Sequence, residues 1–132
     1  MDELYEVKNV TVSIRSPLAD VYAFLSNPEN IPRWASGLGG GVQRVDGEWI
    51  AHGVLGSVRV RFVPKNDFGV ADHDVTLENG ATFHNPLRVV PNGAGCSVIF
   101  TLLRLPGVSP EEFERDGKTI QKDLTTLKAL LE

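Results

Sequence analysis

The sequence is poor in residues that support disulfides or metal sites. It contains one cysteine, Cys96, which excludes an internal disulfide and a CxxC-type metal site. Cys96 has no base beside it, so we expect a small half-buried side chain there and not a nucleophile. Three histidines are present, His52, His73 and His84, but their spacing matches no zinc site. We therefore expect no metal and no cofactor.

A basic surface is missing as well. Thirteen Lys and Arg residues stand against seventeen Asp and Glu residues, which gives a formal net charge of −4. Nucleic-acid affinity comes mostly from the neutralisation of phosphates. The acidic balance of this chain therefore predicts no nucleic-acid partner.

The third absence is a long hydrophobic run. No apolar stretch approaches the ~20 residues that cross a bilayer, so we expect no stable membrane insertion. Residues 1–16 are polar and strand-like, without the charged and apolar regions of a signal peptide. Together these observations predict a cytoplasmic protein.

What is present describes one globular domain. Hydrophobic residues make up 42% of the chain and charged residues 23%, both near globular averages, so disorder is not expected. A chain of 132 residues is long enough for one sizeable core and too short for two ordinary domains. We therefore expect residues 1–132 to form a single domain.

The first third of the chain predicts a strand and two short helices. Apolar residues alternate with polar ones within residues 5–15, as in a half-buried strand. Ser16 and Pro17 then match an N-cap and a first helical residue. A second short helix is expected near residues 29–35, followed by the glycine-rich loop 37–41.

The middle of the chain predicts a meander of antiparallel strands, because turn signals recur at short intervals. These signals are Asp46-Gly47, Leu55-Gly56, Asn66-Asp67, Asn79-Gly80 and Asn92-Gly93. After the meander, Ser109-Pro110 and Glu112 form the capping box of a long helix. Its apolar stripe consists of Phe113, Gly117, Ile120, Leu124, Leu127 and Leu131.

A sheet with one apolar face and a helix with one apolar stripe must bury each other. The expected fold class is therefore α+β. A curved antiparallel sheet of about seven strands wraps around a long C-terminal helix, and two short helices lie between the first and second strands.

Three segments carry a resemblance to a known family. They are Val12-Ser13-Ile14, the stretch from Ser16-Pro17 through Asn27-Pro28-Glu29 to Ile31-Pro32-Arg33-Trp34, and the closing helix from Asp123-Leu124 to Leu131. With the order of elements, they resemble the SRPBCC superfamily, the helix-grip fold of START lipid-binding domains, Bet v 1-like proteins and polyketide cyclase/dehydrase-like proteins. The resemblance covers the whole chain. It implies a cavity between sheet and long helix that holds an apolar or aromatic small molecule.

The register around Asn79-Gly80 decides which residues face this cavity. A three-residue loop, 78–80, gives one continuous apolar face, whereas a two-residue turn does not. The preferred register places His73 opposite Asn85 on the apolar face. Its other pairs are Val75 with Phe83, Leu77 with Ala81, Ala71 with Leu87 and, on the opposite face, Asp74 with His84 and Asp72 near Arg88.

The neighbouring hairpins are assigned by the same reasoning. A turn at Leu55-Gly56 predicts the inner pairs Trp49 with Phe62, Ala51 with Val60 and Gly53 with Val58, and the outer pairs His52 with Arg59 and Ile50 with Arg61. A four-residue turn, 92–95, predicts the pairs Leu87 with Phe100 and Val89 with Val98. A single bulge would invert any of these registers.

His73 and Asn85 are the main candidates for chemistry. Adjacent strand residues point to opposite faces, so neither Asp72 nor Asp74 can orient the His73 ring. Two interpretations stay open: a buried histidine satisfied by the Asn85 amide, or an imidazole that contacts or protonates a ligand. Burial favours the neutral imidazole, which suits an acceptor or a base.

Three further features also have two interpretations each. Trp34 is either a core plug or a wall of the ligand site. The loop 37–41 is either a flexible connection or a mobile lid at the cavity mouth. Gly117 lies on the buried stripe, where glycine costs about 1 kcal/mol relative to alanine. It either packs closely against the sheet or leaves room for a ligand.

The leading hypothesis is that the protein binds an apolar or aromatic small molecule, lipid- or polyketide-like, as a monomer or homodimer. The residues expected at the ligand are Trp34, Trp49, Phe62, His73, Phe83, Asn85, Leu87, Phe100, Gly117, Ile120 and Leu124. One alternative is an enzyme of the cyclase/dehydrase kind, with His73 as general acid/base and Asn85 holding its tautomer or polarising an oxygen. A second alternative is an interaction protein whose outer face, with Arg59, Arg61 and Arg88, meets an acidic partner.

Overall fold

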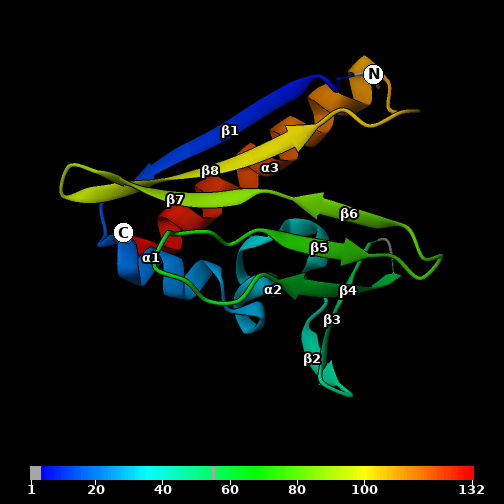
Figure 1. Ribbon diagram of the computed structural model, residues 1–132, viewed down its shortest axis with the longest axis horizontal. Coiled ribbons are helices and arrows are strands. Elements are labelled where there is room, and N and C mark those ends of the chain that lie inside the picture. Colours follow the sequence, from blue (N-terminus) through cyan, green and yellow to red (C-terminus); the bar gives the residue numbers. More distant parts are fainter. Residues whose placement is uncertain (1–3, 55) are drawn as a thin grey trace.

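The computed structural model describes residues 4–54 and 56–132. Over these residues the elements follow the expected order (Figure 1): β1 (Val7–Ile14), α1 (Leu18–Leu25), η1 (Pro28–Asn30), α2 (Ile31–Trp34), η2 (Ser36–Leu38), β2 (Val42–Val45), β3 (Glu48–Gly53), β4 (Gly56–Phe62), β5 (His73–Thr76), β6 (Thr82–Asn85), β7 (Leu87–Asn92), β8 (Gly95–Leu103) and α3 (Pro110–Leu131). The α+β helix-grip architecture is confirmed. Across the described ranges, no helix combines the length and apolar character that crossing a membrane requires.

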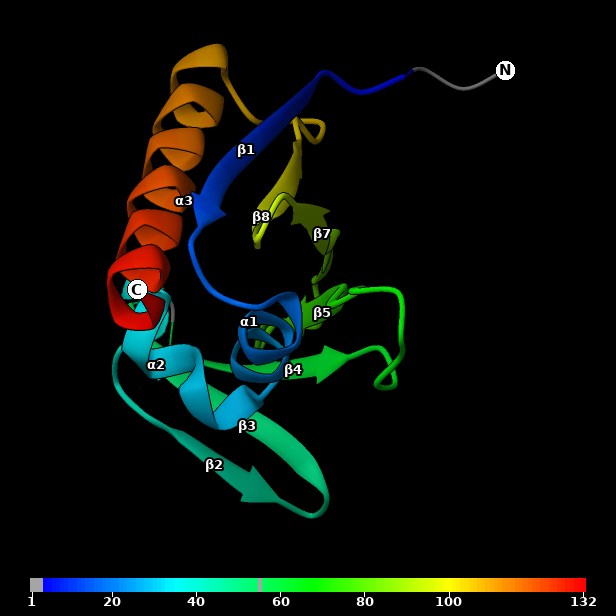
Figure 2. The same cartoon turned by 90° about the vertical axis from the view of Figure 1, so that its left-hand side faces the viewer.

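The strands form one bent wall that is divided into two hydrogen-bonded sheets. Their orders are β1-β8-β7 and β2-β3-β4-β5-β6, with antiparallel pairing. The division falls at Pro86, between β6 and β7, because proline has no N–H to continue a ladder. The Pro86 carbonyl instead accepts a hydrogen bond from the Thr101 amide at 3.1 Å. Figure 2 shows the wall curving beside α3, with α1 and α2 near the C-terminal end of that helix.

The predicted registers on both sides of this division are confirmed. His73 lies opposite Asn85, and Val75 lies opposite Phe83. The Leu77 amide donates to the Ala81 carbonyl at 2.8 Å, which closes the three-residue loop. Gly80 has φ +91°, the left-handed conformation that this loop requires. In the next hairpin Leu87 pairs with Phe100 and Val89 with Val98, as expected.

The predicted register of β3 and β4 is wrong by two residues. Trp49 pairs with Val60, not Phe62, and Ala51 pairs with Val58, not Val60. A shift of two preserves the alternation of side chains, so Ala51, Val58 and Val60 are still buried together. The hairpin closes earlier than predicted, between paired Gly53 and Gly56. On the outer face the pairs are therefore His52 with Ser57 and Ile50 with Arg59. Leu55, part of the predicted turn, lies outside the described residues.

The predicted N-cap of α1 is also wrong, while that of α3 is confirmed. Pro17 occupies the N-cap position of α1, and no side chain caps this helix. The Ser16 hydroxyl donates instead to the Leu131 carbonyl, which connects the start of α1 to the end of α3. At α3 the Glu112 amide donates to the Ser109 hydroxyl at 3.1 Å, within a complete capping box.

The main core lies between α3, α1 and the three-stranded sheet. Leu124 and Leu127 of α3 are fully buried there. Their fully buried neighbours in this core are Val21, Leu25, Leu87 and Val98. A second, smaller core beneath α2 contains Ile31, Ala51, Val58 and Val60. The helix stripe is therefore sealed against one part of the wall, while Ile120, one turn earlier, is only half-buried.

Candidate functional site

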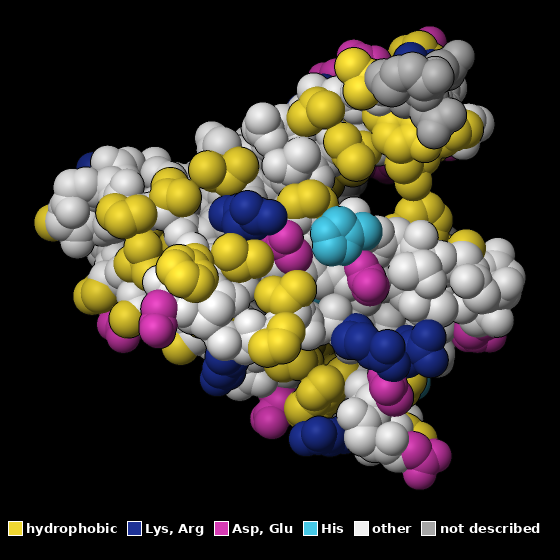
Figure 3. All heavy atoms as spheres, viewed as in Figure 1, with side chains coloured by type: hydrophobic (Ala, Val, Ile, Leu, Met, Phe, Trp, Pro, Cys, Tyr) yellow, Lys and Arg dark blue, Asp and Glu magenta, His cyan; other side chains and the backbone are white. Residues whose placement is uncertain are grey.

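An apolar cleft of about 420 Å³ opens between α3 and the inner side of the five-stranded sheet. Its lining residues are Gly37, Leu38, Val54, Val58, Val75, Leu77, Phe83, Asn85, Phe100, Leu102, Asp116, Thr119 and Ile120. Figure 3 shows the surface hollowed on the right, beside the β5–β6 hairpin, with hydrophobic side chains inside the hollow. The cleft therefore lies between sheet and long helix, the location that the fold resemblance implies.

Two periodicities bring these side chains together. On β5 and β6, residues two apart share a face, so Val75 lies on the inner side with Phe83 and Asn85. On α3, Asp116 and Ile120 are four residues apart and share one helix face. The cleft is thus assembled from one face of each short strand, the end of β8 and one flank of the helix.

The structure brings four of the predicted ligand residues into this cleft: Phe83, Asn85, Phe100 and Ile120. Three others, Trp34, Leu87 and Leu124, are buried in the main core, and Phe62 packs against it. Trp49 lies on β3 with the Arg44 guanidinium 5.4 Å from its ring centroid. These five residues do not line the cleft.

Trp34 carries a buried polar atom without a partner. Its Nε1–H finds no acceptor among the described residues, although the side chain is only 7% exposed. A buried donor left unpaired typically costs about 1–3 kcal/mol. Trp34 thus lies in the core, as one of its two interpretations expected, but with an unsatisfied N–H.

Gly117 does not line the cleft either, because its free side is turned toward β1. A Cβ at Gly117 would lie 2.8 Å from Cδ of Lys8. The Lys8 ammonium bonds to Glu114 at 2.7 Å and lies 5.2 Å from the Phe113 ring centroid. The close-packing interpretation of Gly117 therefore describes this arrangement, with a lysine stem in the space above the glycine.

His73 is held behind the cleft wall. Its Nδ1 lies 3.1 Å from the Ala71 carbonyl, which can only accept, so Nδ1 carries the proton and Nε2 has the free lone pair. The ring centroid lies 4.8 Å from that of Phe62 and 6.4 Å from that of Phe100. Burial lowers the pKa of His73, so the imidazole is neutral at neutral pH. His73 is buried and is not among the cleft-lining residues.

Asn85 faces His73 in the register but makes no side-chain hydrogen bond to it. The carbonyl of Ala71, not the amide of Asn85, therefore sets the His73 tautomer. Within the described residues the Asn85 amide has no hydrogen-bond partner, and it is half-buried in the cleft wall. Its NH₂ and C=O groups are thus available to a molecule in the cleft.

Several cleft residues were absent from the predicted site. Val58 on β4, Val75 on β5 and Leu77 directly after β5 share the inner face that the register analysis defined, so their signal was present in the sequence. Leu102 lies two residues beyond Phe100 on β8. Asp116 lies four residues before Ile120, and Thr119 lies three residues after Asp116, so helical spacing could have found both. Leu38 and Val54 lie on connections, where alternation gives no guide.

The glycine-rich loop is fastened to β3 at the mouth of the cleft. The Gly40 amide donates to the His52 carbonyl at 2.8 Å. A Cβ at Gly53 would lie only 1.9 Å from the Gly37 carbonyl oxygen, so only glycine permits this approach. The contact places Leu38 in the cleft lining. Whether the loop moves as a lid stays a prediction.

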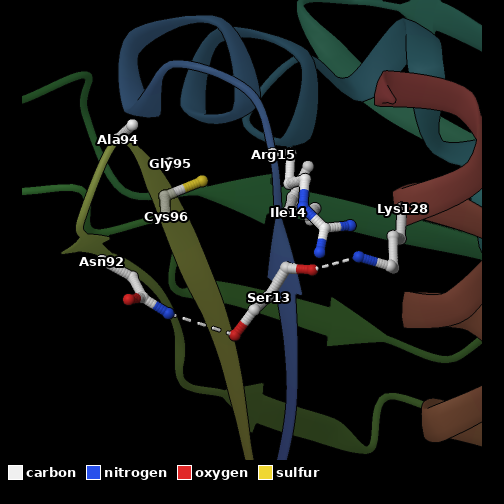
Figure 4. Close-up of a pocket in the computed structure, with 8 residues that line it drawn as sticks. All are labelled: Ser13, Ile14, Arg15, Asn92, Ala94, Gly95, Cys96 and Lys128. Atoms are coloured by element: carbon white, nitrogen blue, oxygen red, sulfur yellow. Dashed lines mark hydrogen bonds between the residues drawn. The ribbon is translucent and has the colours of Figure 1, made fainter.

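A second depression lies where β1, the β7–β8 turn and the last turns of α3 meet (Figure 4). Its polar groups bind one another. The Lys128 ammonium donates to the Ser13 carbonyl at 2.6 Å, and the Asn92 amide donates to the Ser13 hydroxyl at 3.3 Å. Cys96 is buried here, and burial raises the pKa of its thiol, which disfavours the reactive thiolate. This depression offers less to an apolar ligand than the cleft does.

The outer face of the sheet carries charges of both signs. Arg61 contacts Glu48 at 2.6 Å and Arg59 lies 3.8 Å from the same residue. Arg88 binds Asp72 at 2.7 Å. Each arginine of the predicted interaction surface therefore has an acidic neighbour.

Among residues 4–54 and 56–132, no group of three His, Cys, Asp or Glu side chains is arranged to hold a metal ion.

Comparisons with known proteins agree with this architecture. No protein-family model matches the sequence, and no curated protein matches it significantly. The Aha1 dimer from Colwellia psychrerythraea aligns at a TM-score of 0.74 and 12% identity over 96% of each chain. Ara h 8.0201 aligns at 0.71 and 10% identity, over 97% of this chain and 98% of that chain. A START superfamily protein from Mycobacterium smegmatis aligns at 0.66 and 15% identity, over 95% and 96%. The chain therefore has the same helix-grip fold as these three solved structures.

Proposed function

We propose that the protein binds an apolar or aromatic small molecule, lipid- or polyketide-like, in the cleft between α3 and the five-stranded sheet. The observation that carries the proposal is the cleft itself, which has apolar walls and a volume of about 420 Å³. Ligand sites typically have about 300–1,000 Å³, mostly apolar walls and a few polar groups. The Asn85 amide supplies such a group.

Exposed apolar surface at the cleft supports the same proposal. Val54 is 85% exposed and Phe83 is 38% exposed, although both line the cleft. Exposed apolar area is unfavourable by roughly 25 cal/mol per Å² relative to burial. A bound apolar molecule would cover these side chains, so its binding is favoured by area that the fold leaves in water.

The geometry favours binding over catalysis by His73. A general acid or base must come within hydrogen-bonding distance of its substrate, about 2.6–3.2 Å. His73 does not line the cleft, and the ring of Phe100, which does, packs edge-on against it. The interaction alternative is weakened in turn because the outer arginines have acidic neighbours.

The proposal is tested by titrating the protein with N-phenylnaphthylamine, a neutral aromatic probe that fluoresces when it enters an apolar site. Two alanine variants form a matched pair, because Phe83 and Val90 are 38% and 37% exposed. Phe83 lines the cleft, whereas Val90 lies on β7 outside it. We expect saturable binding that F83A weakens about tenfold, as the loss of roughly 1.4 kcal/mol of contact predicts. V90A should bind like the unaltered protein.

Two results would contradict the proposal. One is the absence of saturable binding to the unaltered protein. The other is equal affinity of the unaltered protein, F83A and I120A, which would place the probe elsewhere. Circular dichroism of each variant confirms that a change in affinity does not reflect unfolding.

A further inference from the structure

An acidic side chain lies at the cleft. Among the described residues that line it, only Asp116 carries a formal charge. Among the described residues no ion pair includes Asp116. The ammonium of Lys8 is bound to Glu114 at 2.7 Å, two residues before Asp116 on α3. Within the part of the chain that the structure describes, the charge of Asp116 is therefore not neutralised by an ion pair.

The position of Asp116 determines which part of a ligand meets that charge. Phe100 is 8% exposed and forms the floor of the cleft, Asn85 is half-buried in its wall, and Asp116 is exposed at its rim. A molecule with an apolar body and a polar end gains most by placing the body on the floor and the polar end at the rim. The polar end then lies beside the carboxylate.

We infer that the cleft selects ligands by the charge of this polar end, and that its preferred ligands are apolar or aromatic amines. An ammonium at the rim is attracted to the Asp116 carboxylate, whereas a carboxylate is repelled by it. A neutral alcohol lies between the two. Asn85 does not discriminate, because its amide both donates and accepts hydrogen bonds. This inference rests on the proposed function, since it concerns the same cleft.

The test uses three compounds that share one apolar body: para-butylbenzylamine, para-butylbenzyl alcohol and para-butylbenzoate. Each displaces N-phenylnaphthylamine from the protein at neutral pH and low ionic strength. Attraction and repulsion at a solvent-exposed charge each change affinity by up to about fivefold. We therefore expect the amine to bind about tenfold more tightly than the benzoate, with the alcohol between them. At about 1 M salt, where the Debye length is ~3 Å, the difference should nearly vanish.

Matched variants separate the local charge from the net charge of the protein. D116N should reduce the difference between amine and benzoate to about twofold or less, and D116K should reverse it. Glu111 lies on the same helix, exposed and outside the cleft lining, so E111Q and E111K change the net charge by the same amounts. Both Glu111 variants should bind the amine, the alcohol and the benzoate in the same order of affinity as the unaltered protein.

The outcomes distinguish this inference from the proposed function. If the probe binds and F83A weakens it, but the three compounds displace it equally, the inference is wrong and the proposed function stands. The same conclusion follows if D116N keeps the full preference for the amine. If the probe does not bind at all, both fail. A preference that changes equally in D116K and E111K would assign the selectivity to net charge and overturn the role of Asp116.

Discussion

The two sheets of the wall face α3 in different ways. In the three-stranded sheet, Leu87 and Val98 are fully buried with Leu124 of the helix. In the five-stranded sheet, inner residues such as Phe83 stay partly exposed beside Ile120. Both regions carry the same alternating apolar pattern. The comparison teaches that the pattern identifies the face, while the neighbouring elements decide whether that face becomes core or cleft.

Strand length explains the difference. β1 and β8 have 8 and 9 residues, and β1 packs along the helix. β5 and β6 have 4 residues each and are joined by a turn that ends near the cleft. The short strands therefore leave the N-terminal half of α3 uncovered on one flank. Stability should thus depend mainly on the sealed region, and ligand binding on the open one.

The largest expected effect separates the two regions on a single helix. L124A should lower the free energy of unfolding by about 3–4 kcal/mol, because it opens a cavity in a sealed core. I120A should lower the free energy of unfolding by about 1 kcal/mol or less, because the half-buried side chain already borders solvent. The same variant should weaken the binding of N-phenylnaphthylamine about tenfold. Urea denaturation and probe titration measure the two effects. Equal destabilisation by both variants would contradict the division.

The next effect concerns the ion pair where the two sheets meet. The Arg88 guanidinium donates to both carboxylate oxygens of Asp72, at 2.8 and 2.7 Å, and Asp72 is 6% exposed. R88M leaves this carboxylate with the Leu87 amide as its remaining partner. We expect a loss of about 2–3 kcal/mol of stability, below the value for a fully buried pair because the Arg88 side chain is 49% exposed.

The control for this pair lies on the same face of the sheet. Asp74 and His84 are 2.6 Å apart but are both well exposed. D74N should therefore cost at most about 1 kcal/mol. If D74N and R88M destabilise the protein equally in urea, the Asp72–Arg88 pair has no special role at the junction of the sheets.

The free energy of unfolding should depend on pH because of the buried titratable groups of the wall. Burial lowers the pKa of His73 below its ordinary 6.5, so the unfolded chain takes up a proton in a range where the folded protein does not. The free energy of unfolding should therefore fall as the pH drops below 6.5. The hydrogen bond from Arg88 lowers the pKa of Asp72 below 3.8, which adds a further loss in strong acid.

A pair of phenylalanine variants identifies the histidine that causes the fall in stability. H73F replaces the imidazole with a ring that suits its position between Phe62 and Phe100. It should remove the fall in stability between about pH 6.5 and pH 5. H84F, at an exposed histidine, should leave that fall in place. Urea denaturation at several pH values measures both, and the reverse outcome would mean that His73 does not control the slope.

The smallest effect tests the two interpretations of Gly117. G117A gains helix propensity of about 1 kcal/mol but displaces the Lys8 stem, so its net effect on stability should be small. In a K8A background the same substitution should show the full gain of about 1 kcal/mol. Probe affinity should change less than about twofold, because the space above Gly117 faces β1. A large loss of probe binding would restore the interpretation that Gly117 leaves room for a ligand.

Much of the wall could be predicted from the sequence because an apolar face must be continuous. That requirement fixed the partners of His73 and Val89 to the residue. For β3 and β4 it determined only which side chains point inward and not which residues pair, because a register shift of two residues leaves the same side chains inward. The prediction that Ser16 caps α1 was wrong for another reason. Its hydroxyl meets the distant end of α3, and local sequence carries no signal for that contact.

The site was less predictable than the fold. Ile120 and Leu124 occupy the same helix stripe one turn apart, yet one borders the cleft and the other is sealed. The periodicity of α3 is identical at both positions, so it cannot separate them. The distinction depends on where β5 and β6 end, which follows from turns formed elsewhere in the chain. For the same reason Leu87 and Phe83, on one continuous inner face, have different surroundings.

The most direct test of the account is to locate a bound probe by NMR. With methyl-labelled protein and N-phenylnaphthylamine, we expect intermolecular NOEs from the probe to the methyl groups of Ile120 and Val75. No NOEs should reach Leu124. NOEs to Leu124 or Leu87 would show that the ligand enters the sealed core instead, and a saturating probe without NOEs to Ile120 and Val75 would contradict the assignment of the cleft as the binding site.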